Sequence, residues 1–466
     1  MSDDPVEQFL DDLYPYRNET ETFRQIPETG RPARDVLAEV RSFARREDAM
    51  GDEGRVSGSL YSGDHAHYAV LAEVFEEFAH VNVLQRDMYP SATKFEAEVI
   101  AMVADMLHGR QDGVDACGVL TSGGSESLIT ALYAYREWAA AERGISRPNI
   151  VMPRTAHVAL DKGAHWLGIE VRHAPLTDGY VADVQSMGDL MDDNTIALVG
   201  SAANYAHGLI DPIEDLGRLA SERGVGLHVD GCLGGFILPW IEENGIDMPL
   251  WDYRVPGVTS ISADTHKYGY ALKGTSVLTY RSKELRAHQW FAYPDWPGGL
   301  YVSPGFAGSR SGGLIASTWA SLVLTGREGY LAAARDIYSA AQRIVRGIRE
   351  IPQLQVIGEP TFLVAFGSEE LDIYLVNDEL KRRGWRMNAL QLPPALHFCV
   401  TRPNTPDAVV DAFLADLRAS VDFAAANAGT ASESGALYGF SGSIDGNATI
   451  TTLMAGYLDA LHDPAP

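Results

Sequence analysis

The chain has 466 residues, 46% of them hydrophobic, and a formal net charge of −26. This length exceeds one ordinary hydrophobic core, so two or three packed units are expected. The acidic excess argues against nucleic acid and anionic membranes as general partners, because both are polyanions.

Other features indicate the compartment. The chain lacks the run of about 20 apolar residues that spans a membrane. Its acidic start, MSDDPVEQFLDDLY, does not resemble a secretion signal. The three cysteines, Cys117, Cys232 and Cys399, are far apart and have no metal-ligand spacing. We therefore expect a cytoplasmic protein with reduced, buried cysteines, no bound metal and no transmembrane segment.

In chain order, the first predicted elements are helices. Residues 1–60 are polar, charged and rich in helix formers, so we expect them to pack on the outside of a larger unit or on a partner subunit. In 94–108, apolar residues such as Val99 and Met106 recur at helical spacing. This segment is predicted to form a buried helix, with Gly109 as its C-terminal cap.

From about residue 117, short apolar runs alternate with amphipathic segments. The runs are CGVLTSG, NIVMP, IALVGSA, GLHVDG, TSISAD and GTSVLTY. Such alternation is typical of βαβ units and predicts a mostly parallel sheet. A long helical pattern over 315–350 is followed by the shorter runs LQVIG, FLVAFGS and ALHFCV. Residues 425–445, rich in Ala, Gly and Ser, are expected to form a loop.

These patterns predict an α/β protein with three parts. Residues 1–60 would form a helical N-terminal segment, and 61–340 a large α/β domain that holds the ligand site. Residues 341–466 would form a small C-terminal α+β domain.

The first chemical motif is TSGGSES at 121–127, between an apolar run and a helical pattern. Glycines let the backbone approach an anion, and a helix N-terminus offers free N–H groups and a positive dipole end. The motif therefore suits a phosphate group. Considered alone, it suits a tight strand-to-helix turn equally well.

Three further motifs follow separate apolar runs. His157 comes after NIVMP, Asp230 ends GLHVD, and His266-Lys267 follow SISAD. An imidazole can stack on a pyridine ring, and a carboxylate at a strand end can pair with a pyridinium nitrogen. A desolvated lysine has a lowered pKa and can attack an aldehyde. Alone, each residue has an ordinary structural explanation: a helix-start His, a turn Asp and a surface Lys.

Together, in this order, the four motifs predict a site for pyridoxal 5′-phosphate (PLP). Each stands at the C-terminal end of a different candidate strand, where ligand groups gather in doubly wound sheets. Competing sites lack their motifs. The first strand-turn has no GxGxxG, and the chain has no GxxxxGK[ST] phosphate loop and no GxSxG nucleophile turn.

Several stretches resemble the fold-type I PLP enzymes of the decarboxylase group, and most of all the sphingosine-1-phosphate lyase family. They include VSGSLYSGD, KFEAEVIAM, SISADTHKYGYALKGTSV, YVSPGFAGSRSGG, MNALQLPPALHFCVT and GALYGF. The resemblance covers about residues 55–460. General amino-acid decarboxylases share the Gly-rich turn, the Asp and the His-Lys pair, but not usually SLYSGD or ALYGF.

The resemblance implies a fold-type I homodimer with active sites shared between subunits. It also implies a carbon–carbon lyase of sphingolipid or amino-acid metabolism. Its small-molecule substrate would be a 2-amino-3-hydroxy compound, foremost a sphingoid-base 1-phosphate. Retro-aldol cleavage would then release a long-chain aldehyde and phosphoethanolamine.

The resemblance further implies residue roles. Lys267 would carry PLP and could act as a base, Asp230 would keep the pyridine ring protonated, and His157 would stack on the ring. The other expected cofactor ligands are Gly124, Ser125, Asn204, His266 and Arg310. The expected substrate-binding residues are Tyr61, Gln85 and Lys273.

Two positions depart from the family pattern. Gln85 stands where the family usually has His, and Leu272 stands where it usually has Pro. A neutral amide cannot make the charge-assisted phosphate contact that an imidazolium makes. Three alternatives therefore stay open: an amino-acid α-decarboxylase, a lyase for a smaller non-phosphorylated β-hydroxy amino compound, and a PLP-binding fold without activity.

Overall fold

The computed structural model describes residues 14–438 and 444–464. A seven-stranded sheet forms its centre, in the order β1-β7-β6-β5-β4-β2-β3. The strands are β1 (Cys117–Thr121), β2 (Asn149–Pro153), β3 (Glu170–Ala174), β4 (Thr195–Ser201), β5 (Gly226–Asp230), β6 (Ser260–Ala263) and β7 (Ser276–Tyr280). Strands β2 to β6 run parallel, as predicted, and β7 is antiparallel to both of its neighbours.

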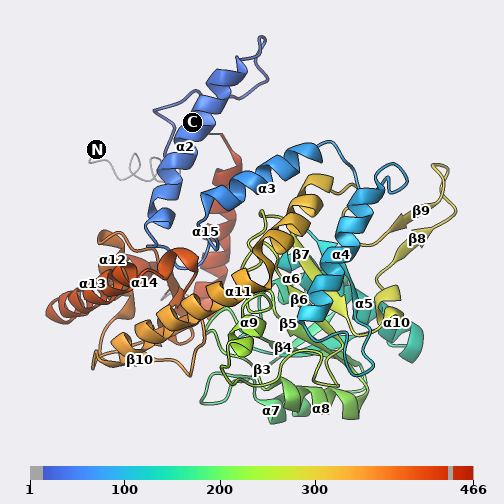
Figure 1. Ribbon diagram of the computed structural model, residues 1–466. Helices are drawn as coiled ribbons and strands as arrows, with labels where there is room; N and C mark the ends of the chain where they lie inside the picture. Colours follow the sequence, from blue (N-terminus) through green and yellow to red (C-terminus); the bar gives the residue numbers. More distant parts are fainter. Residues whose placement is uncertain (1–13, 439–443, 465–466) are drawn as a thin grey trace.

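Helices cover both faces of this sheet (Figure 1). They include α3 (His65–Glu77), α4 (Pro90–Met106), α5 (Gly124–Arg143), α6 (Ala159–Leu167), α7 (Val184–Asp189), α8 (Ile213–Arg223), α9 (Leu238–Glu243) and α10 (Lys283–Ala287). Adjacent strand residues belong to separate cores. Val119 packs with the α5 and α6 side, and Leu120 packs with the α4 and α8 side. Burial on both faces explains why the inner strands read as continuous apolar runs.

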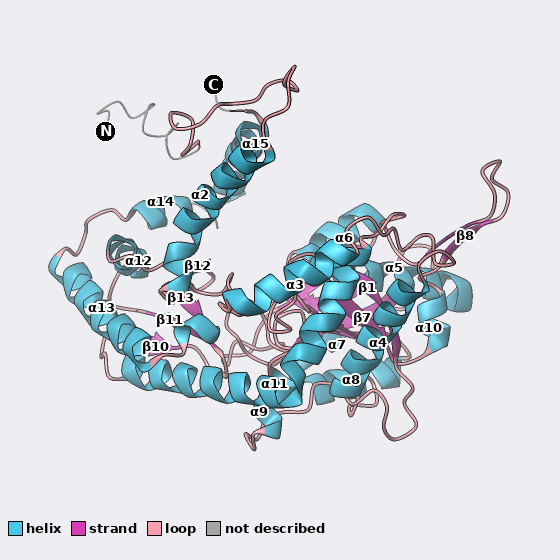
Figure 2. Ribbon diagram, turned by 45° about the horizontal axis from the view of Figure 1, so that its top comes forward, coloured by secondary structure: helices cyan, strands magenta, loops and turns pink. Residues whose placement is uncertain are grey.

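A second sheet, antiparallel and four-stranded, has the order β10-β11-β13-β12. Its strands are β10 (Gln355–Val356), β11 (Leu363–Gly367), β12 (Asn388–Gln391) and β13 (Pro394–Cys399), and its helices are α12 (Ile373–Arg382), α13 (Asp407–Ala426) and α14 (Glu433–Tyr438). The long helix α11 (Gly312–Arg349) runs from the large sheet to the small one (Figure 2). The smaller C-terminal α+β region is therefore confirmed.

Two further elements project from the body. Helix α2 (Ala33–Asp52), which has no buried residue, extends on the same side as α15 (Ile444–His462) (Figure 1). The hairpin of β8 (Phe291–Tyr293) and β9 (Tyr301–Ser303) extends from the large sheet at the opposite end (Figure 2). Over the described ranges, no helix combines the length and apolar character needed to cross a membrane.

The structure corrects two local predictions. Helix α4 ends at Met106, and His108 rather than Gly109 adopts the left-handed conformation, with φ 56°. Residues 433–438 of the expected loop form α14, while 439–443 lie outside the described residues. The backbone N–H groups of Glu433 and Ser434 donate to the buried Asp378 carboxylate. This cap comes from α12, so the local sequence could not reveal it.

Candidate active site

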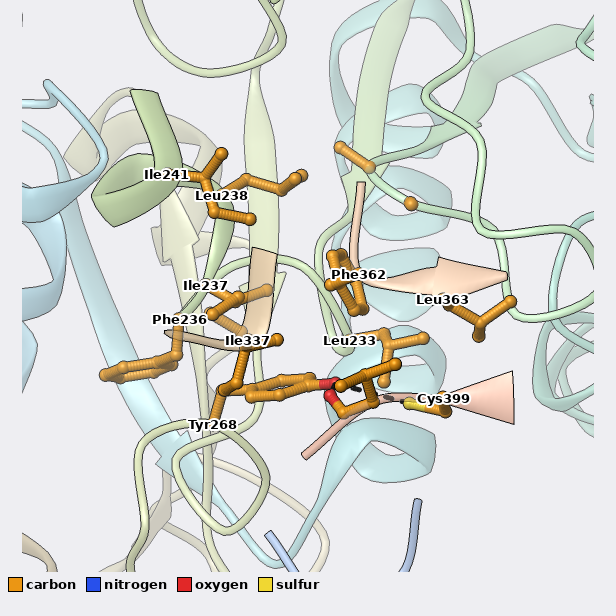
Figure 3. Packing of buried hydrophobic residues seen from close by; sticks show 14 of the residues in the cluster. Leu233, Phe236, Ile237, Leu238, Ile241, Tyr268, Ile337, Phe362, Leu363 and Cys399 are labelled. Carbon is orange, nitrogen blue, oxygen red and sulfur yellow. Dashed lines mark hydrogen bonds between the residues drawn. The ribbon is translucent and has the colours of Figure 1, made fainter. Parts of the chain in front are cut away.

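Lys267 lies in the loop 264–275, which connects β6 to β7 without a helix. Its neighbour Tyr268 is fully buried between the two sheets, where it packs edge-on against Phe362 with ring centroids 5.2 Å apart (Figure 3). The Tyr268 hydroxyl donates to the carbonyl of Val400 at 2.7 Å. The small sheet thus fixes the backbone beside Lys267.

Helix α11 fixes the same loop from another side. The carbonyl of Gly269 accepts hydrogen bonds from the hydroxyls of Ser321 and Tyr330, both at 3.0 Å. Within the loop, the Thr265 hydroxyl donates to that of Thr275 at 2.7 Å. These contacts hold Lys267 rigidly, as a covalent cofactor site requires.

The Lys267 amine contacts a carboxylate. Its Nζ lies 2.9 Å from Oδ2 of Asp264, whose side chain is 2% exposed. Burial alone would lower the pKa of Lys267, but the charge of Asp264 outweighs this effect and raises it. The expectation of a lysine made neutral by desolvation is therefore wrong for this arrangement, because the sequence motif did not reveal the Asp264 contact.

The Gly-rich turn connects β1 to α5 beside this loop. Gly123 has φ 154°, and a Cβ added there would lie 3.2 Å from Cε1 of His266. A Cβ on Gly124 would lie 2.8 Å from Oδ2 of Asp264. Glycine therefore permits a close approach at the start of α5, whose first-turn N–H groups can bind an anion. Ser125 is exposed in that first turn.

Asp230 ends β5 and is 7% exposed. Its Oδ1 accepts a hydrogen bond from the backbone N–H of Cys232 at 3.0 Å and one from the hydroxyl of Ser262 at 3.4 Å. Ser262 also lies 3.3 Å from Nε2 of His228, and burial lowers the pKa of His228 to about 4. Asp230 is therefore a fixed carboxylate at the C-terminal edge of the sheet.

His157 lies on the surface between β2 and α6, where its Nδ1 accepts the N–H of Ala159 at 3.1 Å. Its ring centroid is 6.3 Å from that of Tyr205, which packs edge-on against His397 at 4.9 Å. The sequence analysis missed Tyr205, although it adjoins Asn204. The Asn204 amide bonds within its own loop, to the carbonyl of Leu209 and the N–H of His207.

Lys273 and Tyr61 lie together beside the Lys267 loop. The Nζ of Lys273 is 4.7 Å from the Tyr61 ring centroid and donates to the carbonyl of His266 at 3.2 Å. Burial and the charge of Lys267 lower the pKa of Lys273 to about 8. Burial raises the pKa of Tyr61, whose ring is edge-on to Tyr268 at 4.9 Å.

Gln85 and Arg310 form a separate group. The segments 81–83 and 310–312 are joined by backbone hydrogen bonds, and Gln85 is exposed. The guanidinium of Arg310 binds both oxygens of the buried Glu96, at 2.6 and 3.0 Å. The structure therefore commits Arg310 to a carboxylate, and its role in cofactor binding stays a prediction.

These features fit PLP. Lys267 is a rigidly held amine, and the glycine turn at the start of α5 leaves room for a phosphate next to His266. Asp230 presents a fixed carboxylate at the same sheet edge, one strand from the Lys267 loop. When bound, PLP would supply an electron sink for bonds broken next to an amine.

Comparisons with known proteins agree with this geometry. A family model described as the pyridoxal-dependent decarboxylase conserved domain matches residues 24–368. The sphingosine-1-phosphate lyase of Arabidopsis thaliana is 43% identical over 425 residues, which cover 90% of this chain and 78% of that protein. The Saccharomyces cerevisiae sphingosine-1-phosphate lyase is 40% identical over 466 residues, covering 98% and 78%.

Solved structures extend the match. The sphingosine-1-phosphate lyase of Burkholderia pseudomallei has a TM-score of 0.90 at 48% identity, covering 97% of this chain and 99% of that chain. Lactobacillus brevis glutamate decarboxylase has a TM-score of 0.74 at 20% identity, covering 89% and 98%, which shows the shared fold alone. The chain is therefore a PLP-dependent lyase that belongs to the sphingosine-1-phosphate lyase family.

Proposed function

We propose that this enzyme cleaves the C2–C3 bond of a sphingoid-base 1-phosphate, giving a long-chain aldehyde and phosphoethanolamine. The observation that carries the proposal is the second cation of the Lys267 loop. Lys273 lies against Tyr61 and acts electrostatically on Lys267. The site thus has a cation for a substrate phosphate in addition to the helix start that suits the cofactor phosphate.

The proposed roles divide the site into two parts. Asp230 holds a proton on the cofactor's ring nitrogen, while Gly124, Ser125 and His266 surround its phosphate. His157, on the surface after β2, covers the ring face. Asn204 keeps its predicted place near the cofactor through the loop that it stabilises.

The second part moves the proton of the C3 hydroxyl. Lys267 and Tyr205 are the candidates for this step. Tyr205 is 49% exposed, and its ring lies between those of His157 and His397. Tyr61 is less suited as a base, because burial raises its pKa. Tyr61 and Lys273 instead position the substrate phosphate.

The test is to incubate the PLP-loaded protein with sphingosine 1-phosphate and to look by mass spectrometry for both products. Appearance of the long-chain aldehyde and phosphoethanolamine supports the proposal. Release of carbon dioxide from amino acids, with no aldehyde from the phosphorylated base, would favour a decarboxylase. If neither reaction occurs in yellow protein, smaller β-hydroxy amino compounds become the substrates to test.

Lys273 should make substrate binding depend on pH. Its pKa of about 8 means that the cation is lost as pH rises through that value. The KM for the phosphorylated substrate should therefore rise above about pH 8, with a smaller change in kcat. Lys273→Arg should flatten the KM profile, and Lys273→Met should raise KM at neutral pH by about tenfold or more. An unchanged KM in Lys273→Met would contradict this role.

Gln85→His should improve the use of the phosphorylated substrate. An imidazolium adds a charge-assisted contact that the amide cannot make, so KM should fall several-fold at mildly acidic pH. The measurement is KM with sphingosine 1-phosphate, compared with that of Gln185→His on α7. An equal KM in both variants would remove Gln85 from the substrate site.

We further propose a homodimer with shared active sites. Apolar side chains are exposed on the β8–β9 hairpin and the nearby segment 84–88, including Leu84, Met88, Leu300 and Phe306. Between them lies a cavity of about 640 Å³ that is also lined by Arg310. A second copy that covers this surface would bring Gln85 and Arg310 toward its own site. Light scattering tests the mass of the assembly.

The proposed division into 1–60, 61–340 and 341–466 gives α2 a place in this dimer. Its exposed apolar residues, such as Val36, Leu37 and Val40, would pack on the partner subunit. We also propose a cytoplasmic location, which the three free and buried cysteines support.

A further inference from the structure

Asp264 is a buried carboxylate in contact with the cofactor lysine. Its side chain is 2% exposed, and its Oδ2 lies 2.9 Å from Nζ of Lys267 and 3.7 Å from Nε2 of His266. Its Oδ1 is buried and has no hydrogen-bond partner in the described part of the chain. A buried carboxylate that is only partly satisfied is costly, so its retention calls for a role.

The position of this carboxylate makes its charge more costly. A Cβ on Gly124 would lie 2.8 Å from Oδ2, so Asp264 adjoins the helix start that suits the cofactor phosphate. Two anions at this place repel each other. The cation in contact with Asp264 is Lys267, which therefore offsets the charge.

The other ionisable groups that act on Lys267 or Asp264 come from several elements. They are Tyr61, Asp230, Cys232, His266, Lys273 and Cys399. Burial raises the pKa of the tyrosine and of both thiols and lowers that of His266, so these groups are neutral at neutral pH. Asp230 acts through Cys232, and Lys273 opposes a charge on Lys267. Asp264 is the charged group in contact with the amine.

We propose that Asp264 is a positioning residue that keeps a proton on the Lys267 nitrogen and sets the pH range in which PLP is attached. To attach, the ammonium gives one proton to solvent, and the amine nitrogen forms a C=N bond with the aldehyde carbon. The aldehyde oxygen leaves as water. The linked nitrogen takes up one proton, which the nearby carboxylate stabilises. This proposal rests on the cofactor and not on the identity of the substrate.

The test compares wild type with Asp264→Asn, which keeps the size of the side chain and removes its charge. PLP is removed with hydroxylamine, and the rate of covalent uptake is followed by visible absorbance from neutral to alkaline pH. The visible band of the loaded protein is then titrated. Both midpoints should fall by about one pH unit or more in Asp264→Asn, with uptake at neutral pH about tenfold faster.

Two variants control for other causes. Asp264→Glu restores the charge and should return both midpoints toward wild type. Glu170→Gln removes a carboxylate from the exposed edge strand β3 and should leave both unchanged. Unshifted midpoints in a folded, PLP-binding Asp264→Asn would overturn the proposal, even if its melting temperature fell, because a purely structural role predicts that result.

A measurement on the wild-type apo-protein covers the case in which Asp264→Asn does not fold. A small amine-acylating reagent is applied over a range of pH, and modification is read by peptide mass spectrometry. Lys267 should begin to react at higher pH than Lys273, because Asp264 holds its proton. The opposite order would overturn the proposal.

Discussion

Replacing Lys267 with Ala should abolish both the visible band of the bound cofactor and turnover. The amine is the attachment point and a candidate base, so the rate should fall by at least about a thousandfold. Absorbance spectra and product detection by mass spectrometry measure the two effects. Lys162→Ala, on the surface of α6, is the matched control and should behave as wild type. A visible band or near-normal turnover in Lys267→Ala would disprove the assignment.

Asp230→Asn should produce the second largest loss. The amide oxygen can still accept the N–H of Cys232, so the local fold is preserved. The amide, however, cannot stabilise a proton on the ring nitrogen of PLP, and kcat should fall about a hundredfold or more.

In this variant PLP should remain attached to Lys267, which separates a loss of chemistry from a loss of binding. The measurements are kcat and the amount of bound PLP, compared with those of Asp215→Asn on the exposed surface of α8. Normal kcat with a full complement of cofactor would show that Asp230 does not tune the ring.

The positions of the central motifs could be predicted, because each follows a buried apolar run. The C-terminal ends of parallel strands meet at one sheet edge, so Asp230 and the loop after β6 had to lie close together. The direction of β7 could not be predicted from its apolar run, because strands of either direction read alike when both faces are buried.

Contacts across long sequence separations explain the rest. Arg310 was expected at a phosphate, but its carboxylate partner, Glu96, lies 214 residues away. Asp264 stood within the recognised motif, yet its contact with Lys267 depends on the exact turn that Tyr268 and Gly269 impose. That contact reverses the expected effect of the environment on the lysine.

The anchoring of the Lys267 loop also affects how the enzyme is made. The loop depends on Tyr330 of α11 and on Val400 beyond β13. A ribosome synthesises Lys267 well before either residue, and early domains begin to fold during synthesis. The nascent chain therefore contains the lysine, the Gly-rich turn and Asp230 before it can hold them in place. Stable cofactor attachment thus marks the completion of the C-terminal region.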